Sequence, residues 1–162
     1  MTSNKIIFIH GLESSGQGFK GNFFRNVFPN INTPNFYGPL EQRMEKLNSI
    51  LLDKDHWIII GSSFGGLMGA LFTLRNPQKV DLLILLAPLL LHPKLHDIKT
   101  SIRIPVIIFH GKRDDVVPLE PTKARAEELF INLEYNEVDD DHFLRPTTKN
   151  NPWMKILKGF LK

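Results

Sequence analysis

The chain has 162 residues, of which 42% are hydrophobic and 23% are charged, and this balance suits one globular domain with a core of its own. The net charge of +3 is small and the 20 basic residues are scattered, so composition gives no reason to expect a nucleic-acid partner. The absence of cysteine excludes disulfides, thiolate metal sites and cysteine nucleophiles. We therefore expect a single domain over residues 1–162.

Two apolar stretches lack the properties of targeting or membrane segments. Residues 6–9 are too few for the apolar region of a signal peptide. Residues 82–91 are almost wholly apolar, but this stretch contains Pro88 and is too short to cross a bilayer. With the lack of cysteine, these features lead us to expect a cytoplasmic protein without a membrane span.

Strand-like and helix-like segments alternate along the chain. Several strand-like segments are unbroken runs of Ile, Leu and Val, a pattern typical of strands that are buried on both faces of a parallel sheet. We expect strands over residues 5–10, 31–36, 57–60, 80–86, 106–110 and 133–138, and helices over residues 19–27, 40–52, 65–75, 120–130 and 152–161. The expected fold class is α/β, with a mostly parallel sheet of about six strands and helices on both faces. In such sheets, ligands bind beyond the carboxyl ends of the strands.

The strand expected over residues 57–60 runs directly into the sequence Gly-Ser-Ser-Phe-Gly-Gly at residues 61–66, and a helix-like segment follows. A strand, a G-x-S-x-G turn and a helix in this order indicate a nucleophile elbow, in which a sharp turn exposes a serine hydroxyl at the top of the sheet. Ser63 has a glycine two positions away on each side, whereas Ser62 does not. Ser63 is therefore the candidate nucleophile.

An acid and a histidine follow two later strands. Asp114 comes after the strand over residues 106–110, and His142 comes after the strand over residues 133–138. A serine nucleophile needs a base to remove its proton, and the imidazole of that base needs a carboxylate to fix its tautomer. Asp115 is an alternative acid, but we expect this side chain to face solvent or to shape the turn. The order serine, acid, histidine is the one expected of α/β-hydrolases.

Four motifs in this order resemble those of the α/β-hydrolase superfamily, and within it the small bacterial serine esterases that lack a lid. They are His-Gly-Leu-Glu-Ser-Ser at residues 10–15, the turn at residues 61–66, His-Gly-Lys-Arg-Asp-Asp-Val-Val-Pro at residues 110–118, and His142 after an acidic loop. The resemblance covers nearly the full chain. It implies a three-layer fold with a minimal lid or none, and Ser63, Asp114 and His142 as the catalytic residues.

The resemblance also implies an oxyanion hole made by the backbone N–H groups of Leu12 and Phe64. His10 precedes a glycine at a strand end, where we expect a structural hydrogen bond and also consider a contact with substrate. Leu89 and Leu90 lie in the short connection where larger relatives carry a lid. They either border an acyl-binding cleft or pack against the sheet. No histidine pair has metal-ligand spacing, so we expect neither a metal nor a cofactor.

The expected function is that of a serine hydrolase which cleaves small-molecule carboxylic esters or thioesters through an acyl-enzyme intermediate. Two alternatives remain open at this point. One is a non-catalytic protein-binding module on the same scaffold, since a fold alone does not secure a function. The other is an acyltransferase or a peptidase that uses the same three residues. We expect a monomer or a small homo-oligomer.

Overall fold

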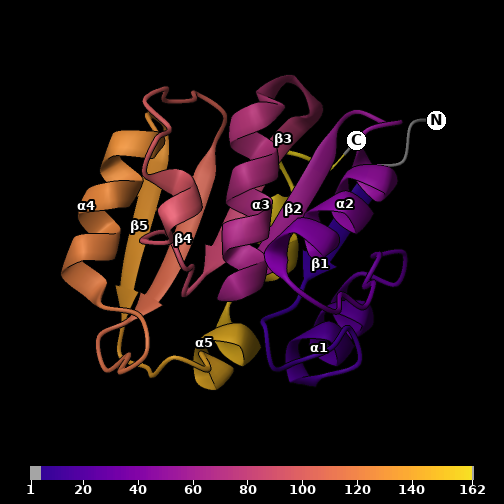
Figure 1. Cartoon of the computed structure of the whole chain (residues 1–162). Helices are drawn as coiled ribbons and strands as arrows, with labels where there is room; N and C mark the ends of the chain where they lie inside the picture. The colour runs from indigo at the N-terminus through magenta and orange to yellow at the C-terminus, as the bar shows by residue number, and fades with distance from the viewer. Residues whose placement is uncertain (1–4, 162) are drawn as a thin grey trace.

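The computed structural model describes residues 5–161 and contains one parallel β-sheet. Its strands lie side by side in sequence order, and all neighbouring pairs are parallel. They are β1 (Lys5–Ile9), β2 (Trp57–Ser62), β3 (Val80–Leu86), β4 (Val106–Gly111) and β5 (Leu133–Val138). Parallel pairing places every carboxyl end at the same edge of the sheet (Figure 1).

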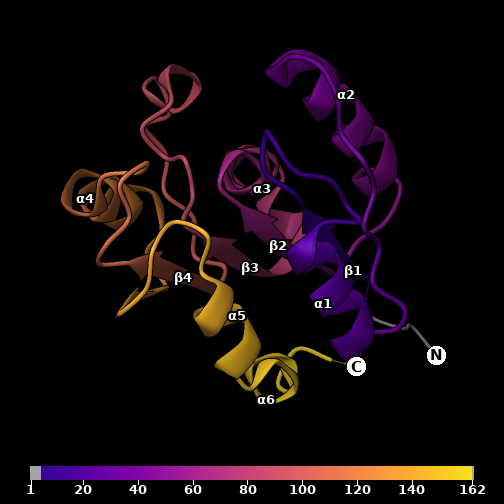
Figure 2. The ribbon, with the colours of Figure 1, turned by 90° about the horizontal axis from the view of Figure 1, so that it is seen from below.

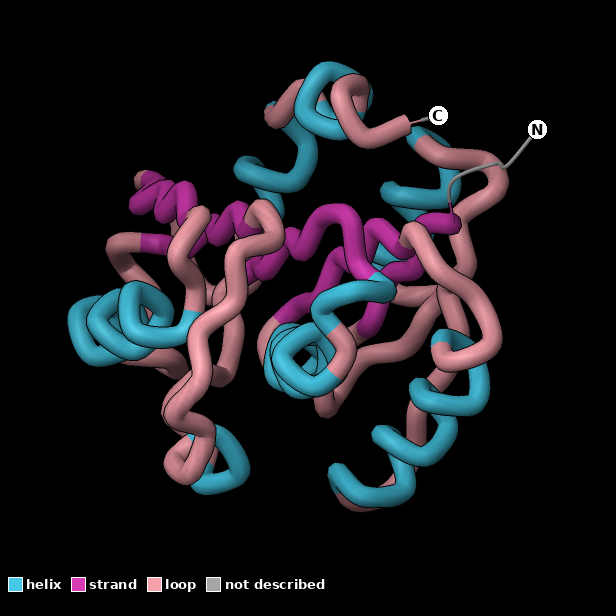
Figure 3. The backbone as a smooth tube through the Cα atoms, turned by 90° about the horizontal axis from the view of Figure 1, so that it is seen from above, coloured by secondary structure: helices cyan, strands magenta, loops and turns pink. Residues whose placement is uncertain are grey.

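Helices cover both faces of this sheet, which gives three layers (Figures 1 and 2). The helices are α1 (Phe19–Val27), α2 (Leu40–Leu51), α3 (Phe64–Arg75), α4 (Leu119–Leu129), α5 (Arg145–Asn150) and α6 (Trp153–Leu157). Seen along the sheet in Figure 3, the strands form a central layer with helices on either side. The expected α/β fold with helices on both faces is confirmed.

The alternation of side chains along β1 explains the two halves of the core. Ile7 and Ile9 pack in the cluster that includes α2, α3 and α4, whereas Ile6 and Phe8 pack in the cluster that includes α1 and α6. Successive side chains of a strand point to opposite faces, so an unbroken apolar run is buried only when both faces are covered. The same rule explains the apolar runs of β2 and β3, both of which are almost completely buried.

The expected strand over residues 31–36 is wrong, and the sheet of the described residues has five named strands instead of about six. In this segment Asn32 forms an isolated parallel bridge with Ile7. Its N–H donates to Ile6 O and its carbonyl accepts from Phe8 N, at 2.8 and 2.9 Å. Pro34 has no N–H to donate, and Asn and Pro are both unfavourable in strands, so the pairing does not continue.

The C-terminal region also differs from expectation. The helix expected over residues 152–161 is limited to α6, and the helix α5 before it was not expected. Pro146 lies in the first turn of α5, where a proline is compatible with a helix, although in the sequence it reads as a breaker. Among residues 5–161, no helix is long and apolar enough to cross a membrane.

The connection between β3 and β4 is a short flap whose regular structure is one turn of 3₁₀ helix, Pro93–Leu95. The Arg125 guanidinium of α4 donates to the carbonyls of Leu95 and Ile98. On the other side, Lys94 forms an ion pair with Glu41 of α2 at 3.6 Å. The expectation of a minimal lid is therefore confirmed, and contacts on both sides hold the flap against the helices.

Candidate active site

A one-residue turn joins β2 to α3 at the carboxyl edge of the sheet. Ser63 occupies this turn with φ 53° and ψ −112°, a conformation that costs a non-glycine residue about 1–3 kcal/mol. The glycines on either side are required by close packing. A Cβ at Gly65 would lie 2.1 Å from the carbonyl oxygen of Ile9, and one at Gly61 would lie 2.5 Å from that of Gly65. The G-x-S-x-G spacing is thus what allows β2 and α3 to meet at so sharp an angle.

The ends of three strands bring Ser63, His142 and Asp114 into one chain of hydrogen bonds. His142 Nε2 lies 3.1 Å from Ser63 Oγ, and His142 Nδ1 lies 2.8 Å from Asp114 Oδ2. A carboxylate only accepts hydrogen bonds, so Nδ1 carries a proton and Nε2 is left to accept the proton of the serine hydroxyl. The Asp114 side chain is completely buried and that of His142 is 13% exposed. Such an arrangement can make a serine oxygen nucleophilic.

The backbone of its own turn holds the Asp114 carboxylate in place. Oδ1 accepts hydrogen bonds from the N–H groups of Val116 and Val117, at 2.9 and 2.8 Å, while Oδ2 faces His142. Asp115, the alternative acid, is exposed. The structure therefore brings Asp114, and not Asp115, to the histidine.

A second, fully buried histidine lies behind the acid. His110 Nε2 donates to Val117 O at 3.0 Å and lies 3.4 Å from Asp114 Oδ2. Its Nδ1 therefore accepts from the hydroxyl of Tyr135, which is 2.6 Å away. Burial, together with nearby carboxylates such as Glu137, raises the pKa of Tyr135 above its ordinary value, so the hydroxyl keeps its proton and can donate. His110 precedes a glycine at a strand end, a position typical of a structural histidine, and these contacts fit such a role. Its position beside the acid could not be predicted from the sequence.

The loop after β1 lies against the elbow. A Cβ at Gly11 would be 3.7 Å from the Cβ of Ser63, and both Leu12 and Phe64 line the cleft around the serine. Phe64 is the first residue of α3, so its N–H has no acceptor within the helix. The backbone of these two segments can thus donate toward an atom bound at Ser63.

Arg43 of α2 contacts both of these segments and was missed in the sequence. Its guanidinium donates to Gly38 O at 2.8 Å and to Leu12 O at 3.3 Å, and lies 5.3 Å from the centre of the Phe64 ring. The residue is only 5% exposed. A signal was available, because Arg43 interrupts the apolar face that Leu40, Met44, Leu47 and Leu51 form at helical spacing.

A cleft of about 600 Å³ opens around Ser63. Its walls combine apolar side chains with a few polar and charged ones, as is typical of a site for a small molecule. The lining residues include Leu12, Phe19, Lys20, Phe64, Leu89 and Arg145, besides Ser63 and His142. Leu89 thus borders the cleft, which was one of the two alternatives considered for it.

Two residues that were considered for contact with substrate lie elsewhere. His10 is 1% exposed, its Nδ1 donates to Gly11 O at 2.7 Å, and its Nε2 accepts from Phe36 N at 2.8 Å. Both ring nitrogens are occupied, so His10 holds the loop after β1 in place and does not contact the cleft. Leu90 is fully buried in the core, although Leu89 beside it faces the cleft. The assignment of His10 and Leu90 to substrate binding is therefore not retained.

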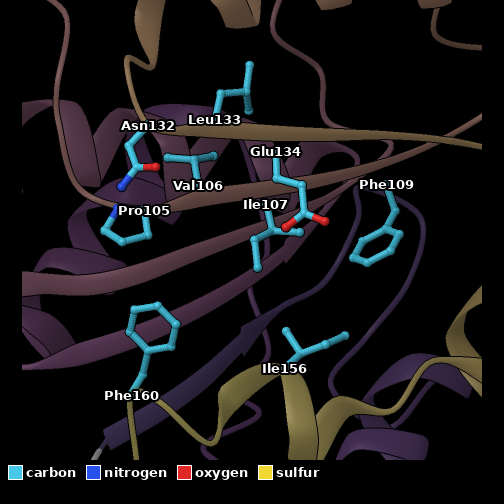
Figure 4. Close-up of a pocket in the computed structure, with 9 residues that line it drawn as sticks. All are labelled: Pro105, Val106, Ile107, Phe109, Asn132, Leu133, Glu134, Ile156 and Phe160. Atoms are coloured by element: carbon cyan, nitrogen blue, oxygen red, sulfur yellow. The ribbon is translucent and has the colours of Figure 1, made fainter.

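A second cavity, of about 370 Å³, lies toward the opposite edge of the sheet, on the face covered by α6, and extends along β4 to Phe109 (Figure 4). It is formed at the amino ends of β4 and β5 and is closed on one side by Ile156 and Phe160. Its lining has no serine, histidine or cation. Within residues 5–161, no three His, Asp or Glu side chains lie close enough together to hold a metal ion. The groups able to do chemistry are thus gathered in the cleft around Ser63.

The sequence of residues 32–162 matches the family described as phospholipase/carboxylesterase, which covers most of the chain. The chain belongs to this family. It is an α/β-hydrolase, in agreement with the resemblance noted in its motifs. Among curated proteins, none matches the chain.

Solved structures of other proteins share the fold at low sequence identity. A protein of the α/β superfamily from Xanthomonas campestris pv. campestris is 21% identical, with a TM-score of 0.78 over 96% of this chain and 99% of the other. An α/β-hydrolase enzyme from a sediment metagenome of the Mar Chica lagoon is 17% identical, with a TM-score of 0.76 over 97% and 91%. A marine microorganism esterase is 14% identical, with a TM-score of 0.73 over 98% and 95%. At these identities the likeness concerns the fold of the α/β-hydrolase, and its chemistry has to be argued from its own residues.

Proposed function

We propose that this α/β-hydrolase is a serine hydrolase that cleaves carboxylic esters or thioesters through an acyl-enzyme intermediate, as a single domain without a cofactor. The observation that carries the proposal is the chain of hydrogen bonds from Ser63 through His142 to the buried Asp114. It ends at a cleft, on a serine held in a strained turn. Strained backbone and a buried acid at one point of a cleft are typical of catalytic sites.

In the first half of the proposed reaction, Ser63 Oγ attacks the carbonyl carbon of the ester while His142 Nε2 takes the hydroxyl proton. The carbonyl oxygen becomes an oxyanion, which accepts hydrogen bonds from the N–H groups of Leu12 and Phe64. Each such donor contributes about 2.7–4 kcal/mol to stabilising the transition state. The tetrahedral intermediate collapses when the bond to the alcohol or thiol breaks. His142 then gives its proton to this leaving group, and the acyl group stays on Ser63.

In the second half, water replaces the alcohol. His142 Nε2 takes one proton of the water as its oxygen attacks the acyl carbon, and the second tetrahedral intermediate releases the carboxylic acid. The proton returns from His142 to Ser63 Oγ, which restores the enzyme. Asp114 keeps Nδ1 protonated throughout and stabilises the imidazolium that forms in each half. Its two bonds from backbone N–H groups hold the carboxylate in the orientation that this role requires.

Family membership favours ester bonds over other acyl bonds, because the family is described as phospholipase/carboxylesterase. One structural neighbour is also named an esterase. The short flap leaves the cleft open, which suits small or extended acyl esters better than a sealed pocket would.

The experiment that tests this proposal combines labelling and turnover. A fluorophosphonate probe reacts covalently only with an activated serine, so we expect it to label the wild-type protein and not Ser63→Ala. Hydrolysis of short p-nitrophenyl esters is expected to fall by about 10⁴-fold or more in Ser63→Ala.

Ser62→Ala is the matched control, because this neighbouring serine also lines the cleft but forms no hydrogen bond with His142 among the described residues. Its labelling is expected to persist. If wild-type protein with a native circular dichroism spectrum is not labelled, the catalytic proposal is wrong and a binding role gains support. Transfer of the acyl group to an added alcohol in place of water would instead indicate an acyltransferase.

A further inference from the structure

Two cations lie in one wall of the cleft that contains Ser63. They are Lys20 of α1 and Arg145, the first residue of α5, and both line the cleft together with Phe19 and Phe143. The two helices come from distant parts of the sequence but lie near each other below the sheet (Figure 2). Leu12, Phe64 and Leu89 also line the cleft, but with apolar side chains.

Lys20 is fixed next to the loop that carries His142. Its Nζ donates to the carbonyl oxygen of Phe143, the residue after His142, at 2.6 Å. An ammonium group has three N–H donors, so this bond leaves two that can reach a ligand. Burial, with a smaller effect from the charge of Arg145, lowers the pKa of Lys20 to about 8. Lys20 is thus mostly protonated at neutral pH, although its surroundings disfavour the charge.

Arg145 is held over an aromatic ring and has its charge unmatched. The guanidinium carbon lies 5.3 Å from the centre of the Phe19 ring, and both residues line the cleft. Among residues 5–161, neither Arg145 nor Lys20 forms an ion pair with a carboxylate within 4.0 Å. Two neighbouring cations that are not paired with a carboxylate repel each other, and a bound anion would relieve that repulsion.

The nearby carboxylates are engaged elsewhere. Asp140 accepts hydrogen bonds from the hydroxyl and N–H of Thr147 and from the N–H of Asp141, and it is only 2% exposed. Asp141 accepts from the N–H of Phe143 at 2.9 Å. Glu13 also lines the cleft, but it belongs to the loop after β1 and forms no ion pair with either cation. The charges of Asp140 and Asp141 offset part of the effect of burial on the pKa of Lys20, but neither carboxylate pairs with Lys20 or Arg145 among the described residues. The remaining N–H donors of these two cations are thus left for a ligand.

We propose that the preferred substrates of this site carry an anionic oxygen group, a carboxylate or a phosphate, which Lys20 and Arg145 bind while the ester carbonyl lies at Ser63. The inference rests on the proposed function for the reaction and names the class of ester. A guanidinium matches the two oxygens of such a group with paired N–H donors, and the ammonium adds a point charge. The anion would thus set the orientation of the ester in the cleft.

Lys149 offers a matched comparison for Arg145. It belongs to the same helix, and its Nζ lies 5.7 Å from the centre of the same Phe19 ring, but it does not line the cleft. Arg145→Met and Lys149→Met therefore remove similar cation–aromatic contacts, and the change in charge is the same. Only the first removes a charge from the wall of the cleft. Arg145→Lys keeps the charge but loses the planar pair of donors.

The test uses esters that differ in one charged group. On the acyl side, p-nitrophenyl pentanoate is compared with mono-p-nitrophenyl glutarate. On the alcohol side, ethyl butyrate is compared with 2-phosphoethyl butyrate, which carries a phosphate on the ethyl group. We expect kcat/KM for the anionic member of at least one pair to fall about tenfold more than for its neutral partner in Arg145→Met, mainly through KM. We expect Lys149→Met to change the ratio of the two kcat/KM values, anionic over neutral, by less than about twofold. In Arg145→Lys, this ratio should lie between those of wild type and Arg145→Met.

The pair with the larger effect shows whether the anionic group belongs to the acyl side or to the alcohol side of the ester. The ratio of anionic to neutral turnover should also fall as the pH rises through about 8, because Lys20 then loses its proton. Since both esters react through the same Ser63, effects of pH on the chemical step cancel in this ratio. Equal losses for both members of both pairs in Arg145→Met would overturn the proposal.

A binding measurement separates this proposal from the proposed function. Glutarate and the uncharged pentanamide are titrated into wild-type protein and Arg145→Met, and binding is followed by calorimetry or by NMR. We expect glutarate to bind wild-type protein more tightly than pentanamide, and Arg145→Met to weaken glutarate binding about fivefold or more. If no ester is hydrolysed but this pattern is seen, the proposed function is wrong and the anion site stands. If esters are hydrolysed but Arg145→Met leaves both the turnover ratio and glutarate binding unchanged, the anion site is wrong and the proposed function stands.

Discussion

The two edges of the sheet each carry a cavity, and the contrast between them is chemical more than geometric. The cleft at the carboxyl edge contains Ser63 and His142 and is bordered by two cations. The cavity at the amino edge is lined mainly by apolar side chains, such as Ile107 and Ile156, with Asn132 and Glu134 as its polar residues (Figure 4). An apolar cavity is therefore not enough to indicate a functional site. The two edges also differ in the N–H groups and side chains that their turns place at the cavity.

The direction of the strands explains this difference. In a parallel sheet, each strand leaves toward a helix at the carboxyl edge, so the free N–H groups of the helix N-terminus and the tight turns occur there. The turn at Ser63 is one residue long, and the Asp114 turn supplies two N–H groups to its own carboxylate. The amino edge instead receives chains that arrive from the ends of helices. The carboxyl edge can thus hold an activated serine, whereas the amino edge mainly contributes to packing.

Substitution of Arg43 is expected to have the largest effect on activity among the variants that test this contrast. Arg43 lies at the carboxyl edge and forms no hydrogen bond with Ser63. Replacement by Met keeps the apolar stem but removes the hydrogen bonds to Leu12 O and Gly38 O. The loop that carries the Leu12 N–H then loses its support, and a shift of about 1 Å at such a donor costs roughly a hundredfold in rate. We expect Arg43→Met to lower kcat for a neutral short ester by about a hundredfold, with little change in KM, in steady-state kinetics.

Arg125→Met is the matched control, since this arginine also donates to two backbone carbonyls but in the flap. We expect Arg125→Met and Arg43→Met to lower the melting temperature by similar amounts. We expect Arg125→Met to change kcat for the same short ester by less than about threefold. Equal losses of kcat in the two variants would mean that Arg43 acts through general stability and not through the loop after β1.

A smaller effect is expected from the amino edge. Ile107 is half-buried and packs against the core cluster that includes Trp153 and Leu157. Truncation to Ala removes part of that contact, and we expect it to lower the free energy of unfolding by about 1–2 kcal/mol in urea denaturation, below the range for a fully buried residue. The value of kcat/KM should stay within about twofold of wild type in the folded protein. A fall of more than tenfold would show that the two edges are coupled and would break the contrast.

Most of the sheet could be predicted from the sequence because buried parallel strands leave a strong local pattern. The bounds expected for residues 80–86 and 133–138 are those of β3 and β5. The segment over residues 31–36 misled the prediction because its pairing depends on one bridge to Ile7, and a proline stops it from extending. The pattern of a segment indicates how well it could form a strand, but not whether a partner is available along its whole length.

The residues of the candidate site likewise include some that the sequence predicts and some that it does not. Ser63, Asp114 and His142 could be proposed because each follows a strand, and the sheet then brings strand ends together. Leu89 and Leu90 could not be distinguished, since adjacent residues of an irregular flap point in directions that no periodicity fixes. Arg43, Lys20 and Arg145 were missed for another reason. The side chains of Lys20 and Arg145 reach the cleft from helices, and that of Arg43 reaches the loop after β1 from α2. Their roles therefore depend on how those helices pack.

The smallest expected effect concerns the backbone at the elbow itself. Ser63 has φ 53°, a region that glycine adopts freely and other residues adopt only at a cost. Ser63→Gly and Ser63→Ala both remove the hydroxyl, but only glycine relieves the strain. We expect Ser63→Gly to be more stable than Ser63→Ala by about 1 kcal/mol in urea denaturation.

Ser49 provides the control, because it is an exposed residue within α2. There the order should reverse, with Gly less stable than Ala by about 1 kcal/mol, since a helical position favours Ala. The same order at both positions would mean that the turn at Ser63 is not strained. Opposite orders would instead indicate that the backbone at Ser63 is strained. The protein would then be less stable at this position because the turn holds the serine in the geometry of the site.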